Sequence, residues 1–136
     1  MRVYLAGPIN GCNDDEANTW RDTVRKHAPP SWTLLDPMRR DYRGREHTHG
    51  REITALDRVD VGLCDVFLAN CPNPSVGTSM EMLLAWQLCK LVVSVVPEGR
   101  YPSPWLVQHS HHVVRGLDSA LGILANFQAD IFLRKG

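Results

Sequence analysis

The sequence has no net charge, no closely spaced cysteine pair and no long apolar run. Fifteen basic residues balance fifteen acidic ones in 136 residues, so no global field draws the chain onto a nucleic-acid polymer or an anionic membrane. The four cysteines form no Cys-x-x-Cys pair, which favours reduced thiols. Apolar runs stay short of the ~20 residues that span a bilayer. We therefore expect a soluble, cytoplasmic protein whose specificity comes from a local site.

Short apolar segments alternate with amphipathic ones along the chain. Apolar, β-prone runs predict strands at residues 3–6, 32–35, 66–70 and 91–96. Helices are predicted at 13–28, 52–63 and 78–89, and a closing helix across the apolar series from Leu117 to Ile131. This alternation favours one α/β domain over residues 1–136, a three-layer sandwich of the Rossmann or flavodoxin-like type with a mostly parallel sheet of about five strands.

The segment Pro74–Glu81 places a hydroxyl, a glycine and a carboxylate where a strand is expected to give way to a helix. Glu81 falls in the first turn of the predicted helix, where the helix dipole favours an ionised carboxylate. Gly77 would let a ligand approach the backbone closely. A glutamate in this position is most often only a solvated partner of the dipole, but beside a ligand-binding loop it is a candidate nucleophile.

Ligands of open parallel sheets bind beyond the carboxyl ends of the strands, where the strand order reverses. If the first and third strands are neighbours, the loop Gly7–Gly11 faces the loop Cys71–Thr78 across that crevice, with Glu81 at its floor. A basic, glycine-punctuated segment follows the second strand, between Arg39 and Arg51. We interpret it either as a solvated surface or as a clamp for phosphate and base, and prefer the clamp because Tyr42 lies among arginines and can stack as well as pair.

Three features together resemble the nucleoside 2-deoxyribosyltransferase family: the segments Tyr4–Ile9 and Pro74–Glu81, and the aspartates Asp57 and Asp65. Their order and spacing carry the resemblance, which covers most of the chain. The family includes relatives that hydrolyse the N-glycosidic bond of nucleoside 5′-monophosphates, and the segment after the second strand is similar to uncharacterised, often phage-borne members. The resemblance implies no cofactor and no metal. It also implies a homodimer or higher homo-oligomer, in which a neighbouring subunit often completes the pocket.

The resemblance implies roles for individual residues. Glu81 would attack the anomeric carbon and form a glycosyl-enzyme intermediate, as in retaining glycoside hydrolysis. The departing base needs a proton from a group with a raised pKa, for which Asp57 is the candidate, with Asp60 as the alternative. Tyr4 would hydrogen-bond and orient Glu81. Each of these residues also has an ordinary structural interpretation, as a helix-surface carboxylate or a packed strand side chain.

The resemblance also implies a phosphate site. Ser75 matches the position at which monophosphate-cleaving relatives hold the 5′-phosphate, and the backbone at the helix start could assist. Asn10 stands where some hydrolase relatives carry a phosphate-contacting arginine, so arginines of the basic segment are expected to replace it. The predicted substrate-binding residues are Gly7, Ile9, Asn10, Asp60, Ser75, Gly77, Thr78, Arg39, Arg40 and Arg43.

The leading hypothesis is cleavage of the N-glycosidic bond of a (deoxy)nucleoside 5′-monophosphate with a pyrimidine or modified pyrimidine base. Base exchange between nucleosides is the second hypothesis, and a non-catalytic nucleotide-binding sensor is the third. The expected partner is a small nucleotide or nucleoside, with no nucleic-acid polymer and no membrane. No metal is predicted, because the three histidines between His109 and His112 have no acidic partner at ligand spacing.

Overall fold

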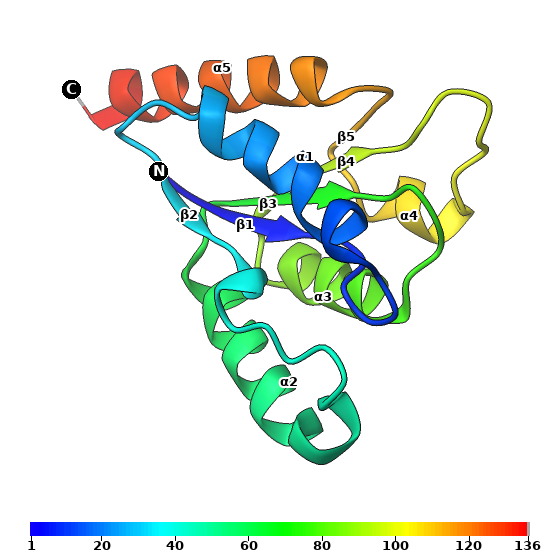
Figure 1. Cartoon of the computed structure of the whole chain (residues 1–136). Helices are drawn as coiled ribbons and strands as arrows, with labels where there is room; N and C mark the ends of the chain where they lie inside the picture. The colour runs from blue at the N-terminus through cyan, green and yellow to red at the C-terminus, as the bar shows by residue number, and fades with distance from the viewer. Residues whose placement is uncertain (136) are drawn as a thin grey trace.

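A computed structural model describes residues 1–135, and within these the chain forms a five-stranded sheet flanked by helices on both faces (Figure 1). The strands are β1 (Arg2–Ala6), β2 (Thr33–Leu35), β3 (Val66–Asn70), β4 (Leu91–Val95) and β5 (His112–Val114). The helices are α1 (Asp14–His27), α2 (Glu46–Leu63), α3 (Val76–Gln87), α4 (Pro104–Gln108) and α5 (Leu117–Lys135), with a 3-10 turn η1 (Pro37–Arg39).

The strand order β2-β1-β3-β4-β5 is that of the flavodoxin-like fold, and every neighbouring pair is parallel. β1 lies beside β3, with Tyr4 opposite Phe67 and Ala6 opposite Ala69. The connections along the chain reverse direction between these two strands, so the loops that follow them meet at the carboxyl edge of the sheet. The predicted fold class is confirmed, and the first and third strands are neighbours, which was the condition for their loops to meet.

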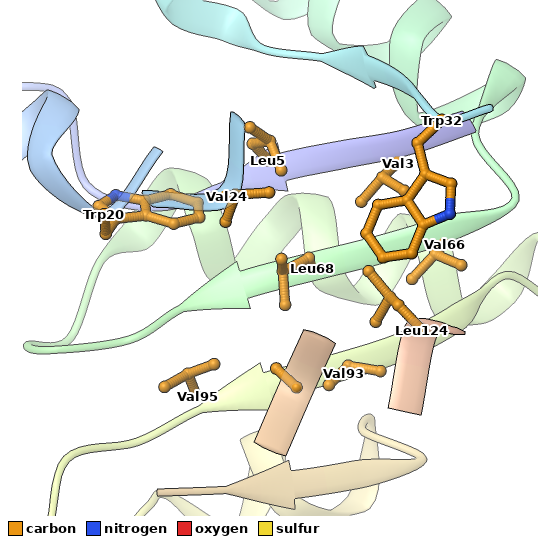
Figure 2. Packing of buried hydrophobic residues seen from close by; sticks show 11 residues of the cluster. Val3, Leu5, Trp20, Val24, Trp32, Val66, Leu68, Val93, Val95 and Leu124 are labelled. Carbon is orange, nitrogen blue, oxygen red and sulfur yellow. The ribbon is translucent and has the colours of Figure 1, made fainter. Parts of the chain in front are cut away.

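Two apolar clusters hold the layers together. On one face α1 and α5 cover the sheet, and Figure 2 shows Trp20 and Leu124 from these helices packed over Val3, Leu5 and Leu68. On the other face α2, α3 and α4 pack against the alternate side chains of the strands. Because the central strands are buried on both faces, their sequences are continuous apolar runs instead of alternating ones.

Local signals account for most helix boundaries. A capping box starts α1, since Asn13 Oδ1 accepts the amide of Glu16 at 2.8 Å and a Glu16 carboxylate oxygen accepts the amide of Asn13 at 3.0 Å. The segment Asp36-Pro37 follows β2 and starts η1, whose first turn is capped by the Asp36 carboxylate.

Several boundaries differ from the predictions. The second helix begins at Glu46 and not at residue 52, with a non-helical residue at His49 where two helical segments join. Because α3 begins at Val76, Glu81 lies in its second turn, and the prediction of a first-turn position is wrong. The short elements α4 and β5 lie in a proline-rich part of the sequence that gave no periodic signal. None of the helices in the described residues combines the length and apolar character needed to cross a bilayer.

Candidate active site

Two carboxyl groups meet where α2 packs against α3. Asp57 on α2 and Glu81 on α3 are close enough to share a hydrogen bond through one proton, and both side chains are partly buried. Burial raises the pKa of Glu81 to about 8, and the Asp57 charge adds to the rise. Burial also raises the pKa of Asp57, while the Arg40 guanidinium beside it acts in the opposite direction. Burial of two adjacent carboxyls therefore favours the uptake of a proton by the pair, and the Arg40 charge opposes it.

The expectation that the helix dipole keeps Glu81 ionised is wrong. The dipole acts mainly within the first turn of a helix, and Glu81 lies beyond that turn. Burial next to Asp57 instead favours the neutral form of Glu81.

Tyr4 brings a hydroxyl to the same place from β1. Its side chain is completely buried, and its ring stacks on Phe67 with centroids 5.5 Å apart. Burial, then the charges of Glu81 and Asp57, raise the pKa of Tyr4 strongly. The hydroxyl lies beside Glu81, but within residues 1–135 it has no partner with proper hydrogen-bond geometry. The predicted Tyr4–Glu81 hydrogen bond is not completed here, so the role of Tyr4 stays a prediction.

Asp60 lies one turn after Asp57 on α2 and is buried. One of its carboxylate oxygens accepts Arg39 Nη2 at 2.6 Å and Arg40 Nη2 at 2.8 Å. Arg40 Nη2 also donates to Asp57 Oδ1 at 3.3 Å. Because Asp60 is held by two guanidinium groups and Asp57 contacts Glu81, this geometry favours Asp57 over Asp60 as the proton donor.

Arg43 is likewise held by carboxylates. Its Nη2 atom lies 2.6 Å from Asp14 and 2.7 Å from Asp41, and its Nη1 atom donates to the carbonyl of Cys12 at 3.2 Å. The three arginines predicted to bind phosphate therefore all pair with aspartates of the same chain. Their predicted role in substrate binding stays a prediction, and it requires that these pairs open.

Ser75 precedes α3 and caps it, since its Oγ accepts the amide of Thr78 at 3.4 Å. The hydroxyl proton can still be donated to a ligand, because the cap uses only an oxygen lone pair. Gly77 is exposed, and a Cβ added there would meet no atom within 4 Å. The fold thus has room for a side chain at position 77, and the predicted approach of a ligand to this glycine stays a prediction.

A cavity of about 570 Å³ adjoins this loop. It is lined by Ser75 and Thr78 on one side and by Arg100, Ser103 and Trp105 on the other, and its walls are mostly apolar. Neither the carboxyl pair nor the tyrosine hydroxyl lines it. The cavity thus adjoins the loop for which phosphate binding is predicted, and Glu81 does not lie at its floor. Arg100 was not singled out from the sequence, because it lies in a proline-rich loop whose position relative to α3 has no sequence signal.

The loop after β1 begins beside the end of β3 and does not line this cavity. A Cβ on Gly7 would lie 2.8 Å from Trp20 Cζ2 and 3.3 Å from the carbonyl oxygen of Asn70, so packing requires glycine at this position. Ile9 is half-buried and Asn10 is exposed. Their predicted contacts with substrate stay predictions.

A buried arginine beneath this loop was also missed. Arg21 on α1 is fully buried, and its Nη2 donates to the carbonyls of Leu5 and Gly7 at 3.2 and 3.3 Å. Its Nε lies 3.2 Å from Asp36 Oδ1. Burial lowers the pKa of Arg21, while Asp36 acts in the opposite direction. The signal for this residue was present, because position 21 falls on the same helical face as the apolar Ala17.

The described residues contain no group of three or more histidine, cysteine, aspartate or glutamate side chains arranged to hold a metal ion. His109 instead stacks on Trp105 with ring centroids 5.5 Å apart, and its Nδ1 lies 2.7 Å from the Trp105 carbonyl oxygen. His111 Nδ1 accepts the amide of Val92 at 3.0 Å. These histidines have structural contacts.

The fold and the site define a class: a flavodoxin-like α/β domain with a pair of partly buried carboxyls near the loops of the central strands. The family model of nucleoside 2-deoxyribosyltransferases matches residues 3–128. The chain therefore belongs to the nucleoside 2-deoxyribosyltransferase family, a family of enzymes that act on the N-glycosidic bond of nucleosides and nucleotides. The resemblance stated from the sequence is confirmed.

Solved structures support the fold. A 2-deoxyribosyltransferase from Bacillus psychrosaccharolyticus is 15% identical, with a TM-score of 0.71 over 88% of this chain and 90% of that one. The CMP N-glycosidase BcmB from Clostridium botulinum is 20% identical, with a TM-score of 0.62 over 92% and 99%. A conserved protein from Enterococcus faecalis V583 is 15% identical, with a TM-score of 0.72 over 90% and 95%. A comparison with curated proteins gave no significant match.

Proposed function

We propose that this protein hydrolyses the N-glycosidic bond of a (deoxy)nucleoside 5′-monophosphate whose base is a pyrimidine or a modified pyrimidine. Glu81 is the nucleophile, Asp57 is the general acid, and Tyr4 orients Glu81. The reaction passes through a glycosyl-enzyme intermediate. The observation that carries the proposal is the proximity of the partly buried Asp57 and Glu81 carboxyls.

This proximity supports a double displacement. An inverting hydrolase keeps its two carboxyls ~6.5–9.5 Å apart so that a water fits beside the sugar, whereas retaining enzymes bring them closer. In the first step a Glu81 oxygen bonds to the anomeric carbon as the glycosidic bond breaks. The bonding electrons leave with the base, and the base takes a proton from Asp57. In the second step water attacks the anomeric carbon, giving its proton to Asp57 and releasing Glu81.

Tyr4 supports the same scheme through its unpaired hydroxyl. A buried donor without a partner destabilises a folded protein, and this one lies beside the nucleophile. Once Glu81 is ionised, its carboxylate accepts a stronger, charge-assisted hydrogen bond from that hydroxyl. The hydrogen bond then fixes the carboxylate for attack.

The preference for a monophosphate rests on Ser75 and on a cation near it. Ser75 can donate a hydrogen bond while it caps α3. Arg100 lines the same cavity, whereas the arginines predicted from the sequence are paired with aspartates. Arg100 is therefore the cation that we assign to the 5′-phosphate, together with the backbone of Gly77 and Thr78.

The test is a chromatographic screen of the purified protein against ribo- and deoxyribonucleoside monophosphates, including 5-substituted pyrimidines. We expect release of free base and of a sugar phosphate. Glu81→Gln and Glu81→Ala should abolish turnover and still fold and bind nucleotide. A Glu81 variant with an unchanged rate would overturn the assignment of the nucleophile.

Base exchange is the second candidate, favoured by the matched family, whose description names deoxyribosyl transfer. A transferase must exclude water from the glycosyl-enzyme until an acceptor base arrives. Adding a second free base to the same assay separates the two reactions. Formation of a new nucleoside or nucleotide only in its presence would identify transfer. Tight binding without base release under either condition would support the nucleotide-sensor alternative.

The expected homo-oligomer belongs to the same proposal. Ser103, His109 and Ser110 are the candidates for completing the pocket of a neighbouring subunit. They lie next to α4, and Ser103 and His109 line the cavity beside Ser75. Exposed apolar side chains surround that cavity, among them Met80 and Trp105. Sedimentation of the purified protein tests whether it forms a dimer.

A further inference from the structure

Arg40 joins two aspartates that lie one turn apart on α2. Its Nη2 atom donates to Asp60 Oδ2 at 2.8 Å and to Asp57 Oδ1 at 3.3 Å. Asp60 has a second guanidinium partner, Arg39, whereas Arg40 is the only guanidinium hydrogen-bonded to Asp57 within residues 1–135. The contact uses one Asp57 oxygen, which leaves the other oxygen for the proton shared with Glu81.

The backbone holds Arg40 firmly in this place. Its amide donates to the carbonyl of Pro37 at 3.0 Å and so closes η1. The first residue before that turn, Asp36, caps the amide of Met38 at 2.8 Å and is itself paired with the buried Arg21. A turn that is anchored in the core therefore positions the Arg40 guanidinium beside α2.

The charged and titratable groups around Asp57 come from every element packed against it. Asp60 lies on the same helix, and Arg40 approaches from the end of η1. Glu81 faces Asp57 from α3, and Tyr4 faces it from β1. Arg21 on α1 acts on Glu81 and not directly on Asp57. Arg40 is thus the cation in direct contact with the pair.

We propose that Arg40 is a positioning residue that keeps the Asp57–Glu81 pair at one shared proton, so that one carboxyl can attack while the other donates. The proposal rests on the proposed function for its role in turnover. With two protons the pair has no carboxylate to attack the sugar, and with none it has no acid for the base. Burial and mutual repulsion favour uptake of protons by both groups, and the Arg40 charge prevents the second uptake at neutral pH.

The shared proton is also the one that leaves with the base. For Glu81 to attack, this proton has to lie on Asp57, and its movement across the hydrogen bond leaves the net charge of the pair unchanged at one negative charge. The Glu81 carboxylate then bonds to the anomeric carbon. The proton on Asp57 passes to the departing base, which has taken the electrons of the glycosidic bond.

The first test is the pH dependence of kcat/KM for the nucleoside monophosphate that is cleaved fastest. We expect Arg40→Ala and Arg40→Gln to shift the low-pH limb of the kcat/KM profile to higher pH by about one unit, which is a tenfold change in proton concentration. Arg40→Lys keeps the positive charge, so the low-pH limb of its profile should lie close to that of the wild type. Arg58→Ala is the matched control, because it removes an exposed positive charge beside Asp57 on the same helix. An unmoved limb in Arg40→Ala and Arg40→Gln, or an equal shift in Arg58→Ala, would overturn the proposal.

The second test needs no turnover. Carbon-13 NMR of the side-chain carboxyls, recorded without ligand, follows the titration of Asp57 and Glu81 directly. In Arg40→Ala and Arg40→Gln the Asp57 carboxyl should titrate at higher pH than in the wild type, and Arg40→Lys should resemble the wild type. If this shift occurs but no base is ever released, the proposed function fails and the role of Arg40 in proton sharing stands. If base is released and the Asp57 titration does not move, the role of Arg40 is wrong.

Discussion

The guanidinium Nε of Arg21 lies 3.2 Å from a carboxylate oxygen of Asp36, and both side chains are buried. Removing one member of a buried ion pair leaves an uncompensated charge, which typically costs about 3–5 kcal/mol. We therefore expect Arg21→Ala to lower the free energy of unfolding by that amount in urea denaturation. Arg25→Ala removes a half-exposed partner of Asp36 and should cost about 1 kcal/mol or less. Similar stabilities of the two variants would contradict the account of this pair.

Tyr4→Phe separates catalysis from stability. The Tyr4 hydroxyl is buried without a good partner, so its removal should leave the free energy of unfolding within about 1 kcal/mol of the wild type or raise it. If the hydroxyl orients Glu81 during the reaction, kcat should fall at least about tenfold. Thermal unfolding and steady-state kinetics of the same sample provide both values. A less stable variant with unchanged kcat would assign Tyr4 to packing alone.

Gly77→Ala tests whether a ligand explains the glycine. Nothing in the fold occupies the space of its Cβ, and alanine favours helix over glycine by up to about 1 kcal/mol. The variant should be as stable as the wild type or more stable, while its KM for the monophosphate rises. Gly122→Ala in α5 is the matched control, since its Cβ also meets nothing within 4 Å and it should change stability only. Equal KM values for both variants would exclude position 77 from the binding site.

The carboxyl pair gives a pH dependence of stability with a definite sign. The pKa of Glu81 rises from its ordinary 4.5 to about 8 in the folded protein, so the folded state binds this proton more tightly than the unfolded state. The associated stability is complete below pH 4.5 and is lost as the pH rises through 8. Between pH 5 and 9 the wild type should lose about 2–4 kcal/mol relative to Glu81→Gln. Parallel stability curves for the two proteins would show that Glu81 is not perturbed.

Cys89 offers a stabilising substitution away from the site. It follows α3 with φ at +56°, a left-handed conformation that glycine adopts without strain after a helix. Because Cys89 is exposed and its side chain contributes no core packing, Cys89→Gly should raise the free energy of unfolding by about 1 kcal/mol. Urea denaturation checks the value. A destabilised variant would mean that the thiol has a contact that outweighs the backbone strain.

The sequence predicted the fold well where short-range signals decide it. The buried strand at 66–70 was predicted to the residue, because a continuous apolar run between a polar boundary and a proline-rich loop is unambiguous. The start of α2 was not predicted, since its first residues are polar and their helical form depends on the preceding arginine loop. β5 is three residues long, and its position depends on pairing with β4 and not on its own composition.

Part of the site was also predicted, because its motif residues can be recognised from local sequence whereas their tertiary contacts cannot. Motif residues such as Glu81, Asp57 and Tyr4 were named from sequence and come together in space. The ion pairs of Arg40 and Asp60 were not foreseen, because they join segments whose mutual approach depends on tertiary packing. The ionisation of Glu81 was predicted with the wrong sign, since helix position was read from the sequence while burial beside a second carboxyl was not visible there.

The most direct test of the central claim is to trap the glycosyl-enzyme. A 2′-fluoro analogue of the cleaved nucleotide slows breakdown of the sugar ester, and mass spectrometry of the digested protein locates the added sugar phosphate. We predict that one sugar phosphate is attached to the peptide that carries Glu81, and that Glu81→Gln remains unlabelled. Release of base with the label on another residue, or with Glu81 unlabelled throughout, would contradict the assignment of Glu81 as the nucleophile.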